Sequence, residues 1–268
     1  MVVAVKIKET SQSIEPVSID LCSGWYWIPA ALFLSGGFIV AMGGYNRPLF
    51  LVIHKAGWHI SPVFWQLLTF CGGTLPVLAL LLLLVRRYPQ LLWNAVLAGM
   101  LAMAWSHGLK AWMNISRPPA VLGPDLLHVI GPRLKHGSFP SGHATTAFTI
   151  AGLVALRVEK CWWRLCLLAV ATLVGMSRIM VGVHWPVDVL AGACGGWLSA
   201  GAGLWLSGRW TAGLKLRRVL IILFILCGVA LLFFDSRYPA ARWLAVFLAL
   251  LTVPAGLLAL GATWREEF

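Results

Sequence analysis

The stretch FPSGHATTAF, residues 139–148, begins an apolar run that continues to about residue 157. Ser141 and His143 are polar, which is unusual at the entrance of a helix suited to a membrane. A helix N-terminus presents unpaired backbone N–H groups and a partial positive charge, and Gly142 allows an anion to approach the backbone closely. The stretch therefore predicts a helix whose first turn binds an oxyanion, most readily a phosphate. A simple N-cap at Ser141 is the alternative.

The composition around this stretch is that of a membrane protein. Of 268 residues, 60% are hydrophobic and 11% are charged, whereas about a quarter are charged in a soluble domain. The net charge of +12 comes from cations that lie mostly between apolar runs, so topology and anionic lipid explain it better than a nucleic-acid partner. The six cysteines form no CxxC pair, and we interpret them as small apolar residues.

The apolar runs predict an all-α, polytopic transmembrane bundle that forms one membrane domain. Each run approaches the length that a membrane-spanning helix requires. Residues 1–24 are polar and of mixed charge, without the apolar core of a cleavable signal, and are expected to form a cytoplasmic tail. The eight predicted spans are roughly 25–43, 64–85, 91–109, 139–157, 162–181, 185–206, 218–234 and 241–261.

The distribution of Lys and Arg predicts the orientation of these spans. With the N-terminus inside, 12 of the 21 cations fall on the inner side and nine on the outer side. Three of the outer nine belong to the candidate site described next, and setting them aside leaves six outside, so the excess is cytoplasmic. The loop 110–138 and the junction 178–184 then face the outside together, and the parity of the spans alone puts them on one face.

The first candidate stretch at this face is KAWMNISRP, residues 110–118. Lys110 and Arg117 are seven residues apart, so a continuing helix would place both cations on one helical face. Pro118 would then end that helix. Cations that extend from a helix end to the membrane surface are the alternative explanation.

The second is SRIMVGVHWPVD, residues 177–188. Asp188 follows His184 by four residues, so its carboxylate can reach the imidazole, fix the tautomer and raise the basicity of the other ring nitrogen. An interfacial ion pair between Arg178 and Asp188 is the alternative.

Taken together, the stretches bring three cations, two histidines, a serine and a carboxylate to one face. Three cations suit the oxygens of a phosphoryl group, and two histidines suit a nucleophile and an acid. Few carboxylates and no cysteines are nearby, so neither a two-metal site nor another cofactor is expected.

These motifs resemble those of the type 2 phosphatidic acid phosphatase superfamily, which carries K-x6-RP, PSGH and SR-x5-H-x3-D. All three are complete and in order, and their combination is highly specific. The resemblance implies a six-helix catalytic core over residues 25–206, with its site at the outer face, while residues 207–268 add two transmembrane helices and a short tail. The matching residues are Lys110, Arg117, Pro118, Pro140, Ser141, Gly142, His143, Ser177, Arg178, His184 and Asp188.

The resemblance also implies a role for each residue. His184 attacks phosphorus and forms a phosphohistidine, Asp188 holds its imidazole, and His143 protonates the leaving oxygen. The phosphoryl oxygens are bound without a metal by a further set of residues. That set is Lys110, Arg117, Arg178, Ser141 and the backbone at Gly142.

The expected function is that of a metal-independent lipid phosphate or pyrophosphate phosphatase in the bacterial inner membrane, with its site facing the periplasm. Undecaprenyl pyrophosphate, phosphatidylglycerophosphate and lipid A are the substrate classes that the resemblance implies. A phosphotransferase that moves a phosphoryl group from undecaprenyl pyrophosphate to lipid A is the nearest alternative. A non-catalytic lipid transporter is a distant one, because binding alone would not require His143, His184 and Asp188 at these spacings.

Overall fold

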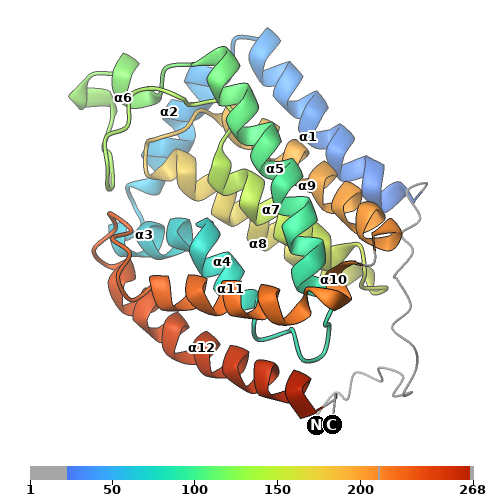
Figure 1. The fold of residues 1–268 in the computed structure, drawn as a ribbon. Helices are drawn as coiled ribbons and strands as arrows, with labels where there is room; N and C mark the ends of the chain where they lie inside the picture. Colours follow the sequence, from blue (N-terminus) through green and yellow to red (C-terminus); the bar gives the residue numbers. More distant parts are fainter. Residues whose placement is uncertain (1–22, 211, 266–268) are drawn as a thin grey trace, which may run out of the picture.

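The computed structural model describes residues 23–210 and 212–265, and these residues form helices without a strand (Figure 1). The predicted all-α membrane bundle is therefore confirmed. The expected N-terminal tail falls almost wholly on residues 1–22, outside the described residues. The helices are α1 (Gly24–Met42), α2 (Asn46–Gly57), α3 (Pro62–Cys71), α4 (Thr74–Leu81), α5 (Leu91–Met113), α6 (Pro118–Val121), α7 (Gly142–Ala155), α8 (Cys161–Met180), α9 (Pro186–Arg209), α10 (Ala212–Lys215), α11 (Arg217–Ala230) and α12 (Ala241–Arg265), with a 3-10 turn at Pro124–Leu126.

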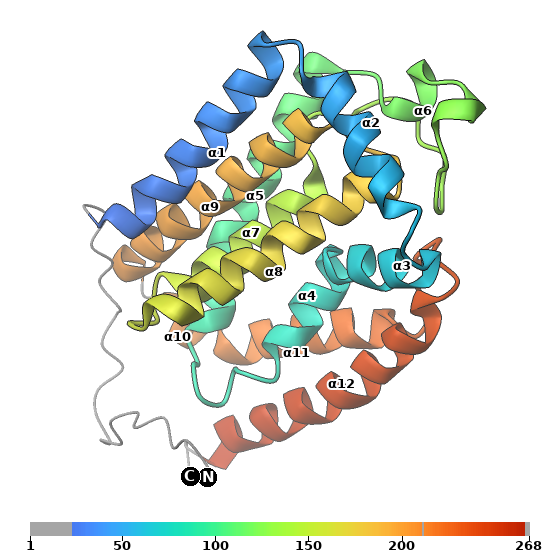
Figure 2. The same cartoon turned by 180° about the vertical axis from the view of Figure 1, so that it is seen from behind.

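Helix α9 lies at the centre of the bundle, packed against α1, α5 and α7, and α1 runs along its outer side (Figure 2). Small residues let these helices approach closely, since a Cβ on Gly196 would lie 2.3 Å from the Thr145 carbonyl oxygen. Trp197 is fully buried in this core, and its indole N–H donates to the Tyr26 carbonyl at 3.0 Å. The packing fixes the start of α9 relative to the start of α7, where the motif residues lie.

Seven of the eight predicted spans each coincide with one helix and the second coincides with the pair α3 and α4, but the helices differ in length. Four of the described helices, α1, α8, α9 and α12, are individually long and apolar enough to cross a membrane, and α3 with α4 makes a fifth if the pair is one bent span. Helices α7 and α11 have 14 residues each, or about 21 Å of helix against an apolar layer of about 30 Å. The apolar runs therefore include segments whose helices are shorter than the thickness of the apolar layer.

The second predicted span is broken at Gly72 and Gly73, where α3 and α4 meet at a bend of 60°. A Cβ on Gly72 would lie 2.6 Å from Val174 Cγ1 and 3.3 Å from His143 Cβ. The bend thus lets the chain pass directly beside α8 and the first turn of α7.

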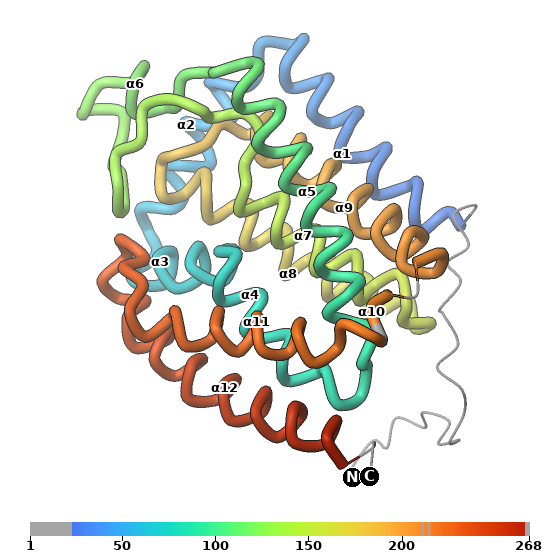
Figure 3. Tube along the Cα trace, viewed as in Figure 1, coloured from blue at the N-terminus to red at the C-terminus, as the bar shows by residue number. Residues whose placement is uncertain are grey.

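Helices α11 and α12 pack against each other and against α4, and α12 also reaches α3. The connection between them extends past the end of α3 toward the loop that follows α6 (Figure 3). The C-terminal helices therefore approach the face that carries the motif residues, as well as flanking the core.

Candidate active site

His184 lies in the turn between α8 and α9, and Asp188 lies in the first turn of α9. Both side chains are buried, and His184 Nδ1 is 3.2 Å from Asp188 Oδ2. The same Oδ2 accepts a hydrogen bond from the Trp185 N–H at 2.8 Å and one from the Ser138 hydroxyl at 2.5 Å. A carboxylate that accepts from Nδ1–H leaves the Nε2 lone pair of His184 available.

Arg117 faces that lone pair. Its Nη1 lies 3.1 Å from His184 Nε2, while its Nε and Nη2 donate to the carbonyl oxygens of His136 and Gly137 at 2.9 and 3.1 Å. Carbonyl partners orient the guanidinium without neutralising it, so the positive charge remains directed at the Nε2 position.

The predicted continuous helix from Lys110 to Arg117 is wrong. Helix α5 ends at Met113, and Asn114 adopts a left-handed conformation with φ of 37°. The next residues pair with the outer loop instead, since the Arg117 N–H donates to the Lys135 carbonyl at 2.8 Å. This backbone pairing competes with helical hydrogen bonds and turns Arg117 toward His184.

The start of α7 is fixed beside the start of α9. The Ser141 N–H donates to the Asp188 carbonyl at 2.9 Å, and Lys110 Nζ donates to the Pro140 carbonyl. Ser141 is buried, and its hydroxyl oxygen accepts from the Ala144 N–H at 3.5 Å, so it caps α7 as the simpler alternative supposed. Its hydroxyl proton makes no other hydrogen bond within the described residues.

Arg178 lies in the last turn of α8 and is 3% exposed. Its Nη1 donates to Thr69 Oγ1 and to Tyr238 Oη, the latter at 3.0 Å. Among the described residues Asp188 makes its ion pair with His184, and the alternative pair with Arg178 is not found there.

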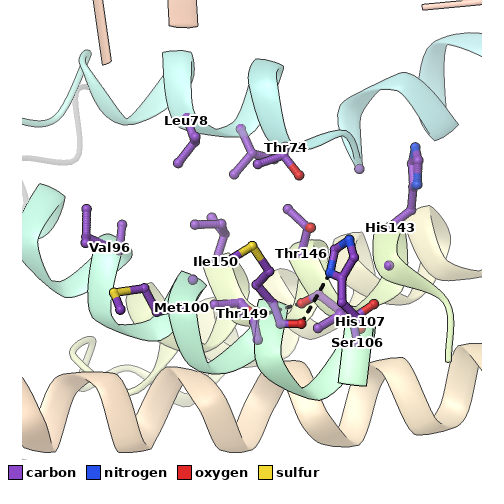
Figure 4. Close-up of a pocket in the computed structure, with 18 of the residues that line it drawn as sticks. Thr74, Leu78, Val96, Met100, Ser106, His107, His143, Thr146, Thr149 and Ile150 are labelled. Atoms are coloured by element: carbon purple, nitrogen blue, oxygen red, sulfur yellow. Dashed lines mark hydrogen bonds between the residues drawn. The ribbon is translucent and has the colours of Figure 1, made fainter. Parts of the chain in front are cut away.

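His143 borders a cavity of about 430 Å³ between α4, α5, α7 and α11. Figure 4 shows His143 and His107 toward one end of this cavity, and Leu78 and Val96 toward the other. The lining away from the two histidines is mostly apolar, with threonines on α7. It includes Thr74, Val77, Leu78, Ala95, Val96, Gly99, Met100, Met103, Ser106, Thr146, Thr149, Ile150 and Phe224.

The cluster has a strongly positive potential. Burial, followed by the charges of Arg117, Arg178 and Lys110 and by His143, lowers the pKa of His184 well below its ordinary value. Burial and the charge of Arg178 lower the pKa of Arg117 to about 10, against an opposing effect of Asp188. His184 is therefore neutral near pH 7, and an anion bound here would relieve the repulsion between the cations.

Four residues outside the motifs support this cluster. Ser138 donates to Asp188, and Thr69 and Tyr238 accept from Arg178. His54 joins α2 to the last turn of α8 and to the outer loop, with Nδ1 3.1 Å from the Ile179 carbonyl and Nε2 accepting from the His128 N–H at 3.1 Å. Each of these residues is separated from its partner by many residues in the sequence, so no motif spacing indicates its role.

No group of three or more His, Cys, Asp or Glu side chains that could hold a metal ion is found in residues 23–210 and 212–265. The positive charge of the cluster comes instead from Lys110, Arg117 and Arg178. Together with the backbone N–H groups at the start of α7, these side chains form an arrangement suited to binding an anion.

A buried His–Asp pair lies among cations at one end of the helical bundle. The PAP2 superfamily model matches residues 91–212. An undecaprenyl-diphosphatase from Sulfolobus acidocaldarius is 33% identical over 185 residues, which cover 65% of this chain and 88% of that protein. The chain belongs to the PAP2 superfamily and is a multi-pass membrane enzyme.

Two further similarities are consistent with this assignment. The crystal structure of Aquifex aeolicus LpxE is 32% identical and superposes with a TM-score of 0.54, over 60% of this chain and 94% of that one. A lipid A 1-phosphatase from Rhizobium etli is 48% identical over 63 residues, which cover 23% of this chain but only 26% of that relative.

Proposed function

We propose that this protein hydrolyses a membrane lipid phosphate or diphosphate through a phosphohistidine at His184. The observation that carries the proposal is the His184–Asp188 pair, in which Nδ1 is held by a carboxylate and Nε2 faces a guanidinium. A neutral imidazole is a competent nucleophile, and the surrounding cations both keep it neutral and attract an anionic substrate.

In the first step, the Nε2 lone pair of His184 attacks phosphorus and the P–O bond to the lipid breaks. The leaving oxygen takes the electron pair of that bond together with a proton from His143 in its protonated form. Asp188 stabilises the positive charge that develops on the imidazole while Nδ1 keeps its proton.

In the second step, a water oxygen attacks phosphorus and the N–P bond breaks, which returns the electron pair to Nε2. His143, now neutral, accepts the proton of that water. Lys110, Arg117 and Arg178 stabilise the charge on the phosphoryl oxygens in both steps, together with Ser141 and the backbone at Gly142. Arg117 must move off Nε2 when phosphate enters, and the substrate oxygens provide the alternative partner.

The cavity beside His143 supports a lipid as the leaving group. His143 lines it, so a hydrocarbon chain in the cavity would bring its phosphate-bearing oxygen toward the proposed acid. The named relatives suggest polyprenyl diphosphates and lipid A as substrate classes, and phosphatidylglycerophosphate belongs to the same chemical class. A phosphotransferase would share the first step and differ only in replacing water by an acceptor lipid.

The catalytic core would comprise residues 25–206 in a bacterial inner membrane, with the site at the periplasmic face. Support comes from the excess of inner-side cations and from two arginine pairs, Arg86–Arg87 in the connection between α4 and α5 and Arg217–Arg218 at the start of α11. That connection and the start of α11 lie at the end of the bundle away from the starts of α7 and α9 (Figure 1). At that face the enzyme would encounter lipid phosphates of the outer leaflet.

The test is phosphate release by the purified protein in detergent. The substrates are polyprenyl diphosphate, phosphatidylglycerophosphate, phosphatidic acid and lipid A, each tested with and without EDTA. In a separate reaction, lipid A is added to polyprenyl diphosphate as a possible phosphoryl acceptor. We expect release from at least one substrate, retention of activity in EDTA, and loss of at least about a thousandfold in His184→Ala. The exposed His59→Ala is the matched control. Phosphate transfer without release would identify the transferase, and no reaction with any lipid would overturn the proposal.

A further inference from the structure

The connection between α11 and α12 is fixed against the site face by several contacts. The Ala240 N–H donates to Gln66 Oε1 on α3 at 3.1 Å. Tyr238 is 5% exposed and packs on Gly131 in the outer loop, where φ is +92° and an added Cβ would lie 2.4 Å from the tyrosine ring. These contacts place the Tyr238 side chain between the C-terminal helices and the loop that carries Arg117.

The hydroxyl of Tyr238 meets a motif residue. Arg178 Nη1 donates to Tyr238 Oη at 3.0 Å and also to Thr69 Oγ1. Arg178 Nε is buried and has no hydrogen-bond partner, and within the described residues the side chain makes its hydrogen bonds through Nη1 alone. Nη1 is thus held by two hydroxyl oxygens, and Nε and Nη2 of the guanidinium can bind another partner.

The chemistry of the two anchors indicates what that partner is. A carboxylate would neutralise the arginine, whereas a phenol and an alcohol orient it and leave its full charge for an anion. Because Tyr238 Oη accepts from Arg178, its own O–H proton remains available to a phosphoryl oxygen.

We propose that Tyr238 is a positioning residue of the phosphoryl site, which holds the Arg178 guanidinium toward the bound phosphate. The other proposed site residues lie between Lys110 and Asp188, and the family match ends at residue 212. The C-terminal helix pair therefore completes the anion site from outside the family core. The inference rests on the proposed function, since it takes Arg178 to bind the phosphoryl group.

The test uses the full-length protein and the variants Tyr238→Phe, Arg178→Gln and the double variant. Tyr238→Phe removes one oxygen and keeps the ring that packs on Gly131, and Tyr45→Phe, at a residue that is 57% exposed, is the matched control. The readouts are the inhibition constant of orthovanadate, the direct binding of vanadate and inorganic phosphate, and kcat and KM for the best lipid substrate.

We expect Tyr238→Phe to raise KM and the vanadate inhibition constant about tenfold, with a smaller change in kcat. In the Arg178→Gln background the same substitution should change vanadate affinity less than about twofold, because the two residues act as a unit. An unchanged affinity in Tyr238→Phe, or an equal loss in both backgrounds, would overturn the inference. If the wild type binds vanadate with this pattern but hydrolyses no lipid, the proposed function fails while the role of Tyr238 stands.

Discussion

His184 Nδ1 and Asp188 Oδ2 lie 3.2 Å apart, although His184 precedes α9 and only Asp188 belongs to it. The carboxylate also accepts from the Trp185 N–H, so it caps the helix and orients the imidazole at the same time. Because one buried carboxylate both caps α9 and orients the nucleophile, changes at Asp188 should affect folding as well as catalysis.

Asp188→Asn should lower kcat about a thousandfold or more, by analogy with the aspartate of other catalytic triads. An amide keeps the shape but loses the charge, and its NH₂ group favours the wrong imidazole tautomer. Steady-state kinetics on the best lipid substrate would measure the loss, with Asp125→Asn, at an exposed loop residue, as the control. A kcat within about tenfold of wild type would mean that the pair is structural.

The depressed pKa of His184 predicts its pH behaviour. In the ligand-free protein it should remain neutral through about pH 6.5, the ordinary value, and take up a proton only at lower pH. The unfolded chain binds that proton first, so the contribution of His184 to folding stability is present above the unfolded pKa and is lost as pH falls through the folded pKa. Imidazole NMR titration, assigned by the signal lost in His184→Ala, measures it.

Arg117→Gln removes the charge that acts most strongly on His184 after burial, so the His184 titration should move to higher pH in this variant. Titration of His184 at or above pH 6.5 in the wild type would contradict the electrostatic account of the site.

Gly196→Ala should destabilise the protein by about 1–3 kcal/mol, as expected for overpacking. The new Cβ would lie 2.3 Å from the Thr145 carbonyl oxygen, so α7 and α9 must separate. A Cβ added at Gly208, in the same helix, would have no atom within 4 Å, so Gly208→Ala should be neutral or stabilising by up to about 1 kcal/mol. Thermal unfolding in detergent compares the two, and equal stabilities would show that the interface is loose.

Sidedness can be tested with single cysteines in a variant that lacks the six native ones. Val121 is 56% exposed on the site face, and Tyr88 is 42% exposed at the other end of the bundle. An impermeant thiol reagent applied to intact spheroplasts should label Val121→Cys and spare Tyr88→Cys. The opposite pattern would place the site in the cytoplasm.

Much of the fold follows from the sequence because apolar run length reports helices suited to a membrane. The motif residues could be assigned to one face because consecutive spans alternate in direction. Lys110, the start of α7 and the His184–Asp188 pair do meet there, through hydrogen bonds that cross between helices. The spacing within each motif is local and is displayed directly by the sequence, and the alternation of the spans supplies the common face.

Features that depend on tertiary contact could not be read in this way. The break at Gly72–Gly73 is required by the approach of Val174 and His143 from other helices. The early end of α5 reflects pairing of the Arg117 backbone with Lys135. Thr69 and Tyr238 lie 109 and 60 residues from Arg178, and no helical period relates positions that far apart.

The proposed mechanism requires that phosphorus is bonded to His184 during turnover. The direct measurement is a rapid-quench experiment with radiolabelled substrate, stopped in alkali because phosphohistidine is labile in acid, followed by peptide mapping of the labelled protein. We expect a transient label on His184 Nε2 that appears no later than free phosphate and is absent in His184→Ala. Release of phosphate with no labelled protein at any time, or a label on another residue, would contradict it.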